Sequence, residues 1–487
     1  MDFRLIARLL SLLFVIFSVG LLLPLGTAIF YDQDNIMNFL TTLAVSSGLA
    51  FSLKRYGAGS MNKKLRIREA FVLLTFGWTM ICVIGTIPYA MVGTMDLTTS
   101  FFESVASFTT TEVCSADSYS FFPPSILVWR GLAHWAGACG VIMLFIIVMP
   151  HMNSGAGHLF NAELPSVVSD RTVPKIKEAA FLVFKIYNAF FWFEVLLLWL
   201  IGTPFLQSIN YALLSMSTGG FSYYYNGEFF AFDNLAMEII CLVFMIIGST
   251  NFSLYYKLWR RDWKAVQEDV EHRYYFLWLL VCGSVMALDL YLTNYYDFKN
   301  SAYMGFMHSI SFGSTTGLAY ADFDKWPGIS RMVIFIMMFV GGCSGSSAGG
   351  IKIGRITILL KATWAEFMRI LHPNVVYTVK MGNRIIAPDV IRNITRFFFM
   401  YIFVFVILTL LISLSGITIM DSMGIIAACL SSVGLATGIV GPTTLAFNDV
   451  PNFGKFIACI AMLLGRIEIF AFLVVLRPDF WRNKANW

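Results

Sequence analysis

The sequence Ser217-Thr218-Gly219-Gly220-Phe221 decides how this chain is expected to fold. It follows an apolar run, Phe205 to Met216, that is too short to cross a bilayer as a helix. A full-length apolar segment comes after it, from Asn234 to Tyr256. Non-helical backbone at membrane depth needs protein or water around it. The pattern therefore predicts a helix that enters the membrane halfway and ends in a turn whose carbonyl oxygens can replace an ion's hydration shell.

Related turns recur along the chain at intervals of about a hundred residues, which is typical of internal repeats. They are Phe108-Thr109-Thr110-Thr111-Glu112, Ser314-Thr315-Thr316-Gly317-Leu318 and the looser Ser432-Val433-Gly434-Leu435. Each follows a short apolar run: the predicted half-spans are Thr98–Phe108, Phe205–Met216, Ala302–Gly313 and Ile419–Ser431. Four copies of span, half-span, turn and span in one chain are predicted to surround one axis.

The composition is that of a polytopic membrane protein. Of 487 residues, 58% are hydrophobic and 13% are charged, whereas a soluble chain carries roughly 25% charged residues. The net charge of +5 comes from basic residues gathered in a few loops, which predicts membrane topology and not nucleic-acid binding. The eight cysteines are scattered through apolar stretches, and we expect buried thiols without metal or disulfide.

The predicted fold is all-α, with an N-terminal transmembrane hairpin followed by four span–pore-helix–span repeats. The hairpin takes residues 1–69, and the repeats take 70–165, 166–265, 266–375 and 376–487. This layout gives about ten full spans of the length that a bilayer requires, and it puts every basic cluster on one side, the cytoplasmic side, together with both termini. The return segments Asn234–Tyr256 and Phe453–Leu476 are expected to be continuous.

The return segment of the third repeat, from Ile329, is expected to be interrupted. Half of the ten residues from Gly341 to Gly350 are glycine, and each glycine costs a helix about 1 kcal/mol relative to alanine. One interpretation is an unwound loop below the turns that acts as a gate. The alternative is a continuous helix whose small residues form a packing face.

The chain resembles the TrkH/KtrB/HKT superfamily of potassium transporters. The motif from Gly341 to Arg355, GGCSGSSAGGIKIGR, is similar to the signature of the superfamily's third repeat. Leu463-Leu464-Gly465-Arg466-Ile467-Glu468 resembles its last helix, and STGGF matches its second filter turn. The resemblance covers essentially the whole chain, and the extra N-terminal hairpin is similar to that of the TrkH branch.

The resemblance implies a function and a set of site residues. It implies potassium uptake across the plasma (inner) membrane, with K⁺ bound in transit, no organic cofactor and no enzymatic activity. It also implies a homodimer with one pore per subunit and a cytosolic TrkA-type nucleotide-binding ring that regulates opening. The filter residues are Thr110, Thr111, Glu112, Thr218, Gly219, Gly220, Thr315, Thr316, Gly317, Ser432, Val433 and Gly434, and the gate residues are Gly341, Gly342, Gly345, Gly349, Gly350 and Arg466.

One filter position departs from the superfamily's pattern. Gly220, Gly317 and Gly434 fill the place that the superfamily gives to glycine, but the first turn has Glu112. The carboxylate can stand at the level of the filter, where an acidic group favours cations without favouring potassium over sodium. It can instead point to the outer vestibule and attract cations there, or it can be held behind the filter by hydroxyl or amide groups.

Charged residues inside other apolar segments also have two interpretations. An arginine at mid-span, such as Arg466, costs about 2.5–3.5 kcal/mol on insertion scales. The superfamily places it below the filter as an electrostatic barrier, while the alternative is an ion pair with Glu468 or another carboxylate. Glu194, Glu238 and Asp289 are expected either to form interhelical hydrogen bonds or to lie near a membrane interface, the alternative being a proton or sodium relay.

Three further functions compete with potassium uptake. Glu112 favours a sodium-permeable or unselective cation pathway. Broken helices are also typical of ion-coupled secondary transporters, although four repeats of one orientation suit a fixed pore better. A regulatory subunit without conduction is the third. The sequence contains no HExxH motif and no clustered histidines, so an enzyme is not expected.

Overall fold

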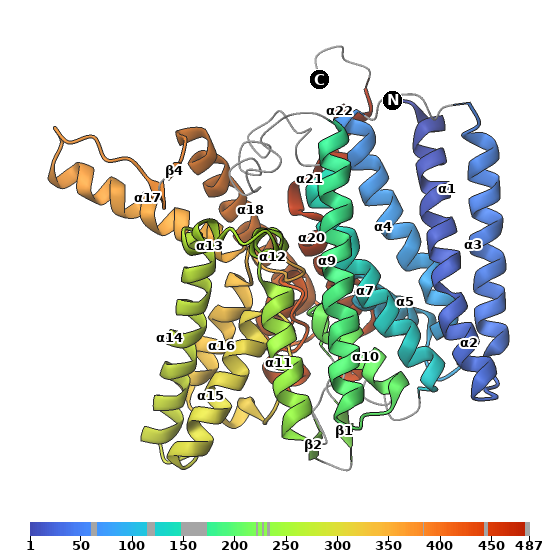
Figure 1. Ribbon diagram of the computed structural model, residues 1–487, viewed down its shortest axis with the longest axis horizontal. Coiled ribbons are helices and arrows are strands. Elements are labelled where there is room, and N and C mark those ends of the chain that lie inside the picture. Colours follow the sequence, from blue (N-terminus) through green and yellow to red (C-terminus); the bar gives the residue numbers. More distant parts are fainter. Residues whose placement is uncertain are drawn as a thin grey trace.

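The structure of this chain, a computed structural model, describes residues 1–59, 66–113, 122–147, 173–220, 223–225, 228–230, 234–382, 384–442 and 447–482. The N-terminal hairpin consists of α1 (Phe3–Gly20), α2 (Leu22–Phe30) and α3 (Ile36–Tyr56). The beginning of α1 and the short α22 (Pro478–Trp481) lie at the same end of the molecule, opposite the turn between α2 and α3 (Figure 1).

Four segments of similar design follow the hairpin. Each has a long first helix: α4 (Ile67–Ala90), α9 (Val173–Leu200), α14 (Val270–Leu292) and α18 (Pro388–Ser413). Each then has a short helix: α5 (Leu97–Thr109), α10 (Phe205–Met216), α15 (Phe298–Gly313) and α19 (Ile419–Leu430). The predicted half-spans match these short helices closely, and the second matches α10 at both ends.

The return segments depart from the prediction in two repeats. In the second repeat, α11 (Leu235–Ser249) and α12 (Phe252–Trp259) meet at a bend of 98°. In the fourth, α20 (Asn452–Ile467) and α21 (Ile469–Leu476) meet at 113°. The expectation of continuous spans there was wrong, because Thr250-Asn251 and Glu468 interrupt the helices. The expected interruption in the third repeat is confirmed: α16 (Gly328–Val340) and α17 (Ile353–Leu371) are separated by non-helical residues.

Within the described residues, six helices are long and apolar enough to cross a membrane, or eight if each bent pair is one span. The first repeat's return helix, α7 (Pro124–Ile147), and the interrupted α16–α17 segment can supply the remaining spans that the sequence predicts. The proposed boundary at residues 165/166 lies outside the described part of the chain.

Small elements complete the fold. They are α13 (Trp263–Gln267), the 3-10 helices η3 (Phe323–Lys325), η4 (Gly438–Val440) and η5 (Phe447–Asp449), and two hairpins, β1 (Tyr223–Tyr225) with β2 (Glu228–Phe230) and β3 (Lys380–Met381) with β4 (Arg384–Ile385). The main apolar core includes buried residues of the pore helices α5 and α19, such as Phe102, Val105 and Ile426. These two short helices are therefore held within the main core.

Candidate functional site

The four pore helices end in turns that begin in the same way. After each helix one non-glycine residue has a left-handed backbone: Thr110 (φ 53°), Thr218 (φ 52°), Thr315 (φ 59°) and Ser432 (φ 55°). The next N–H group donates back to the helix over 2.9–3.0 Å in every copy: Thr111 to Ala106, Gly219 to Leu214, Thr316 to Ser311 and Val433 to Ala428. This is the Schellman pattern of helix ends. A non-glycine residue with positive φ costs about 1–3 kcal/mol, which marks these turns as candidates for function.

The third residues of the four turns, Glu112, Gly220, Gly317 and Gly434, lie beside one another around a ring. A Cβ atom built on Gly220 would lie 2.0 Å from the carbonyl oxygen of Thr316, and one built on Gly317 would lie 2.2 Å from that of Val433. A Cβ atom on Gly434 would lie 2.2 Å from the carbonyl group of Glu112. Each turn therefore touches the next turn in chain order, and the fourth touches the first. The predicted filter residues of all four repeats are brought together at one level, which we call the ring.

Glu112 changes the backbone of the first turn. The other three turns have positive φ at this place, between 61° and 92°, whereas Glu112, itself a described residue, does not. Instead, the N–H of Val113 donates to the carbonyl oxygen of Thr111 over 2.9 Å, which makes Glu112 the centre of a three-residue γ-turn. This conformation suits a residue with a side chain.

The carboxylate of Glu112 lies at the level of the ring. Its Oε2 atom is 2.2 Å from the position that a Cβ on Gly220 would take and 3.0 Å from the corresponding position on Gly317. The contacts around the ring put the third turn opposite the first. Because the carboxylate reaches both the second turn and the third, it extends across the ring. Of the three predicted orientations, this geometry matches the one at the level of the filter.

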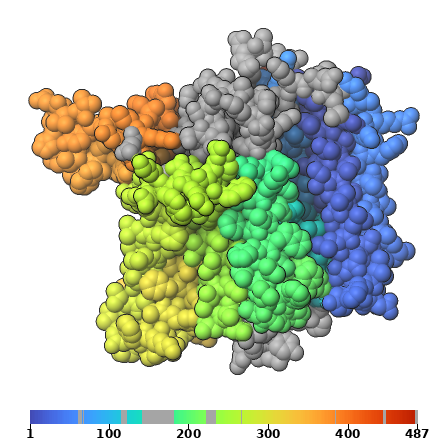
Figure 2. Space-filling view, viewed as in Figure 1, coloured from blue at the N-terminus to red at the C-terminus, as the bar shows by residue number. Residues whose placement is uncertain are grey.

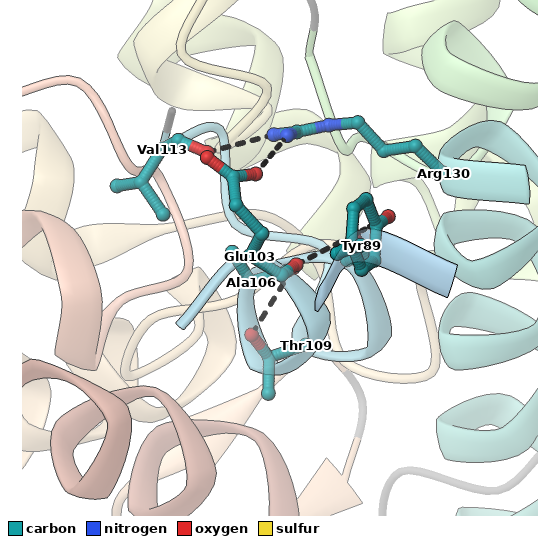
Figure 3. A network of polar contacts seen from close by, with 7 residues as sticks. Tyr89, Glu103, Ala106, Thr109, Val113 and Arg130 are labelled. Carbon is teal, nitrogen blue, oxygen red and sulfur yellow. Dashed lines mark hydrogen bonds and ion pairs between the residues drawn. The ribbon is translucent and has the colours of Figure 1, made fainter. Parts of the chain in front are cut away.

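A buried ion pair supports the first turn (Figure 3). Arg130 of α7 contacts Oε2 of Glu103 on α5 at 2.5 Å through Nη1 and donates to the carbonyl oxygen of Val113 over 2.7 Å through Nη2. Both charged side chains are fully buried. Sequence reasoning missed them, although a charged residue within an apolar span was a signal that could have found Arg130.

The glycine-rich residues 341–352, which we call the gate segment, lie against the turns. The N–H of Gly349 donates to the hydroxyl of Thr315 over 2.8 Å, and a Cβ on Gly349 would lie 2.0 Å from the carbonyl oxygen of Ser431. Positive φ angles occur at Gly341 (68°), Gly345 (74°) and Gly350 (76°). A Cβ on Gly342 would lie 2.8 Å from the carbonyl oxygen of Ser249. The predicted loop is confirmed, and the alternative of a continuous helix is wrong.

Arg466 holds the gate segment from below the turns. Its Nη1 donates to the carbonyl oxygen of Ser347 over 2.8 Å, and the side chain is buried. Ser347 also donates through its hydroxyl to the carbonyl oxygen of Gly248 over 2.8 Å. Glu468 pairs with Arg355 at 2.9 Å, so the predicted alternative of an Arg466–Glu468 ion pair was wrong.

Three basic side chains gather on the far side of the gate segment. Lys352, Arg355 and Arg466 line one small cavity, together with Glu468, Tyr401 and Gly349. The ammonium group of Lys352 donates to the carbonyl oxygen of Ala348. One carboxylate facing three cationic groups leaves this cavity electropositive.

The remaining buried carboxylates join helices to each other. Glu194 of α9 accepts a hydrogen bond from Ser215 of α10. Glu238 of α11 accepts one from Tyr303 of α15 over 2.5 Å. Asp289 of α14 accepts from the hydroxyl of Ser330 on α16 over 2.6 Å. The prediction of interhelical hydrogen bonds is confirmed for all three.

Comparisons with known proteins identify relatives over the whole length. The family of cation transport proteins named TrkH matches residues 31–482. The TrkH potassium uptake protein of the Trk system from Halomonas elongata is 29% identical over 487 residues, covering 99% of this chain and 100% of that protein. Its counterpart from Salmonella typhimurium is 30% identical over 492 residues with the same coverage. The crystal structure of the potassium transporter TrkH from Vibrio parahaemolyticus superimposes with a TM-score of 0.87 at 27% identity, covering 99% of this chain and 100% of that one.

Proposed function

Because this chain belongs to the TrkH family of cation transport proteins, we propose that it takes up potassium ions through a channel-like pathway along the axis of the ring. Its full-length relatives are potassium uptake proteins. The observation that carries the proposal is the ring itself, in which four pore helices present four turns that share the same hydrogen bond back to the helix.

The ring supplies the chemistry that potassium permeation needs. Backbone carbonyl oxygens in fixed turns can replace the water molecules that a monovalent cation sheds. The turns are tightly constrained, because no side chain fits at Gly220, Gly317 or Gly434. A membrane potential then drives the ion with about 2.3 kcal/mol per charge per 100 mV. The twelve predicted filter residues form the selecting ring in this proposal.

The gate segment and Arg466 control passage below the ring. Gly341, Gly342, Gly345, Gly349 and Gly350 give this segment a backbone without side chains to obstruct its movement. The hydrogen bond from Arg466 to Ser347 keeps it under the turns. Opening requires that bond to break, so that the segment moves aside and the positive charge of Arg466 is withdrawn from the path.

Glu112 favours a second candidate, a pathway that admits sodium as well as potassium. Its carboxylate at the level of the ring adds a full negative charge to carbonyl dipoles, and such a charge attracts both ions. Coupling to a second ion, as in a secondary transporter, has no comparable observation in its favour. The potassium pathway remains the leading proposal because it agrees with the relatives' function.

The experiment is ion flux into vesicles that contain the purified protein, with K⁺ or Na⁺ as the only permeant cation. We expect the wild type to pass K⁺ faster than Na⁺. Equal fluxes in the wild type, with a preference for K⁺ in Glu112→Gly, would favour the second candidate. The matched control is Asp34→Asn, which removes an exposed carboxylate at the turn between α2 and α3. Absence of K⁺ flux in all three proteins would overturn potassium uptake.

The topology, localisation and partners form one proposal. The chain lies in the plasma (inner) membrane with both termini cytoplasmic, as the common end of α1 and α22 (Figure 1) and the basic loops suggest. A homodimer and a cytosolic TrkA-type nucleotide-binding ring are its partners. Apolar side chains on α17, which projects from the body in Figure 2 (orange), suit a contact with a second subunit: Leu360, Trp364, Phe367, Ile370 and Leu371 are all exposed.

A further inference from the structure

We propose that Glu112 and the backbone oxygens around it form a binding site for a divalent cation of the calcium class inside the ring, and that such a cation blocks the flux of monovalent ions. The predicted block of monovalent flux rests on the proposed function. The binding site itself depends only on the geometry of Glu112 and the neighbouring turns.

The first step is the place of the carboxylate. Oε2 of Glu112 and the carbonyl oxygen of Thr316 both lie within 2.2 Å of the single point that a Cβ on Gly220 would occupy. The carbonyl oxygen of Val433 lies 2.2 Å from the corresponding point on Gly317, and Oε2 lies 3.0 Å from it. Oxygens from the first, third and fourth turns thus converge on the same small part of the ring.

The second step is the chemistry of these oxygens. Calcium binds carboxylate and backbone carbonyl oxygens in flexible arrangements that also include water. A ring of carbonyl groups alone suits a weakly held monovalent ion, which must leave as easily as it enters. Because the Coulomb attraction to a carboxylate doubles for a doubly charged ion, the addition of Glu112 favours divalent cations over K⁺ and lengthens their stay.

The third step is the charge balance around Glu112. Arg130, which donates to Val113 beside the first turn, is paired with Glu103, so this pair adds no net charge there. Arg466 lies beyond the gate segment, where it contacts Ser347. Positive charge therefore lies below the ring, where the gate segment and Arg466 oppose the onward passage of a divalent ion.

The fourth step is the fixed backbone that holds the carboxylate. The γ-turn at Glu112 and the ion-paired Arg130 at Val113 set the direction in which the side chain leaves the first turn. A Cβ on Gly434 would meet the backbone of Glu112 at 2.2 Å, so the fourth turn confines it from the other side. The site is thus built by the fold and does not depend on a mobile side chain finding a partner.

Two measurements test the proposal on the purified full-length protein. The first is equilibrium binding of ⁴⁵Ca²⁺ in a buffer free of K⁺ and Na⁺, and the second is K⁺ flux into vesicles at increasing CaCl₂. A single carboxylate with carbonyl ligands predicts half-saturation on the order of 10⁻⁴–10⁻³ M, the range of weak calcium sites. We expect flux to fall by half in the same range in the wild type.

The variants are Glu112→Gln, which keeps the side chain's shape without its charge, and Glu112→Gly, which makes the first turn like the others. Both should weaken Ca²⁺ binding and Ca²⁺ block at least tenfold, while Asp34→Asn should leave both unchanged. Binding of Ca²⁺ to the wild type but not to Glu112→Gln supports the site even if no protein conducts K⁺, in which case the proposed function fails alone. Equal Ca²⁺ binding in the wild type and Glu112→Gln, or none in the wild type up to about 10 mM, a concentration tenfold above the weak-site range, would overturn the site.

Discussion

The four turns of the ring and the gate segment are both non-helical backbone between apolar helices, yet they are held in different ways. Each turn is anchored to its own pore helix by the same hydrogen bond five residues back. The gate segment keeps backbone hydrogen bonds to the end of α16, such as that from Lys352 to Val340, but its central residues are anchored by other elements: Cys343 donates to Ser249, Ser344 to Glu271, and Gly349 to Thr315. We call a hydrogen bond to the segment's own helix a local anchor and a hydrogen bond to another element a borrowed anchor. Local anchors form together with the helix, whereas borrowed anchors can be replaced one at a time.

The difference indicates which backbone is fixed and which can move. Breaking a turn requires the end of a buried helix to unwind. Moving the gate segment requires only that a few hydrogen bonds, each worth about 0.5–1.5 kcal/mol net, be replaced by others. A ring that selects ions has to be rigid, and a gate has to have two arrangements of similar free energy.

The largest effect should follow a side chain added to the ring. In Gly434→Ala the new Cβ would meet the backbone of Glu112 at 2.2 Å, and the residue would keep a φ of 92°. Since no flexible atom can yield there, the first and fourth turns must separate. We expect K⁺ flux into vesicles to fall at least about a hundredfold, the loss that a displacement of about 1 Å produces in a preorganised site.

Gly416→Ala separates the strain of positive φ from the effect on the ring. Gly416 has a φ of 89°, but a Cβ added there meets nothing within 4 Å. This variant should lose about 1–2 kcal/mol of stability from the left-handed backbone and keep its K⁺ flux. If Gly416→Ala lost flux as Gly434→Ala does, close contact between the turns would not be what the ring requires.

The second prediction concerns the first turn, whose borrowed anchor is the hydrogen bond from the buried Arg130 to the carbonyl oxygen of Val113. In Arg130→Met, Glu103 is left as a buried charge without its arginine, which costs about 3–5 kcal/mol. We expect a lower melting temperature in detergent and a reduced yield of folded protein.

The double variant Arg130→Met with Glu103→Gln tests the cause of that loss. Without the buried charge, most of the stability should return, while the carbonyl of Val113 still lacks its donor. The double variant should then fold and conduct with altered selectivity. If the double variant were as unstable as Arg130→Met alone, the ion pair would not be the source of the effect.

The sequence predicted the short helices well because a change in residue type marks each of their ends. The run from Phe205 to Met216 is apolar, follows Pro204 and ends at the polar Ser217, and α10 has these bounds. Glycine content likewise revealed the break between α16 and α17. The breaks at Thr250-Asn251 and Glu468 were missed, because apolar residues continue on both sides and hydropathy does not register the backbone.

The contacts within the site could not be predicted from the sequence, because they depend on the order of the turns around the ring. The identity of Glu112 as the departing residue was visible in the sequence, but its reach to Gly317 follows only from the third turn lying opposite the first. The Arg130–Glu103 pair joins two helices, and the hydrogen bond from Arg466 to Ser347 joins residues of different repeats. No local pattern contains such partners.

The third prediction concerns the gate segment's borrowed anchors. In Arg466→Gln the hydrogen bond to the carbonyl of Ser347 is weakened and a buried positive charge is removed from below the ring. Both changes favour passage of cations. We expect K⁺ flux into vesicles to rise by roughly tenfold, the factor that corresponds to a barrier lowered by about 1.4 kcal/mol.

Arg466→Lys separates the two contributions, since it keeps the charge but loses the guanidinium geometry. A rise in flux in Arg466→Gln alone would assign the barrier to the charge, and a rise in both would assign it to the anchor. Arg392→Gln is the control, because Arg392 is an exposed arginine on α18. Unchanged flux in both Arg466 variants would remove this residue from the gate.

The smallest effect is expected at a borrowed anchor outside the membrane-spanning segments. Asp324 of η3 accepts a hydrogen bond from the N–H of Gly438, in the loop after the fourth turn, over 3.0 Å. The pKa of the Asp324 carboxyl is raised from 3.8 to about 6, chiefly by burial and also by the charges of Asp322 and Asp421, while the Gly438 N–H and Arg331 oppose the shift. The folded protein therefore binds a proton that the unfolded chain releases, and stability falls as the pH rises from about 4 to about 6.

Asp324→Asn should remove this pH dependence while keeping a hydrogen-bond acceptor for Gly438. Since the group is only partly buried and solvent screens its charge, we expect a gain below about 1 kcal/mol above pH 6, or about 1–2 °C in melting temperature. At pH 4 the variant and the wild type should melt together. A destabilised variant at pH 7.5 would contradict this expectation. It would mean that the ionised carboxylate, through its hydrogen bond to Gly438, stabilises the loop by more than the free-energy cost of its burial.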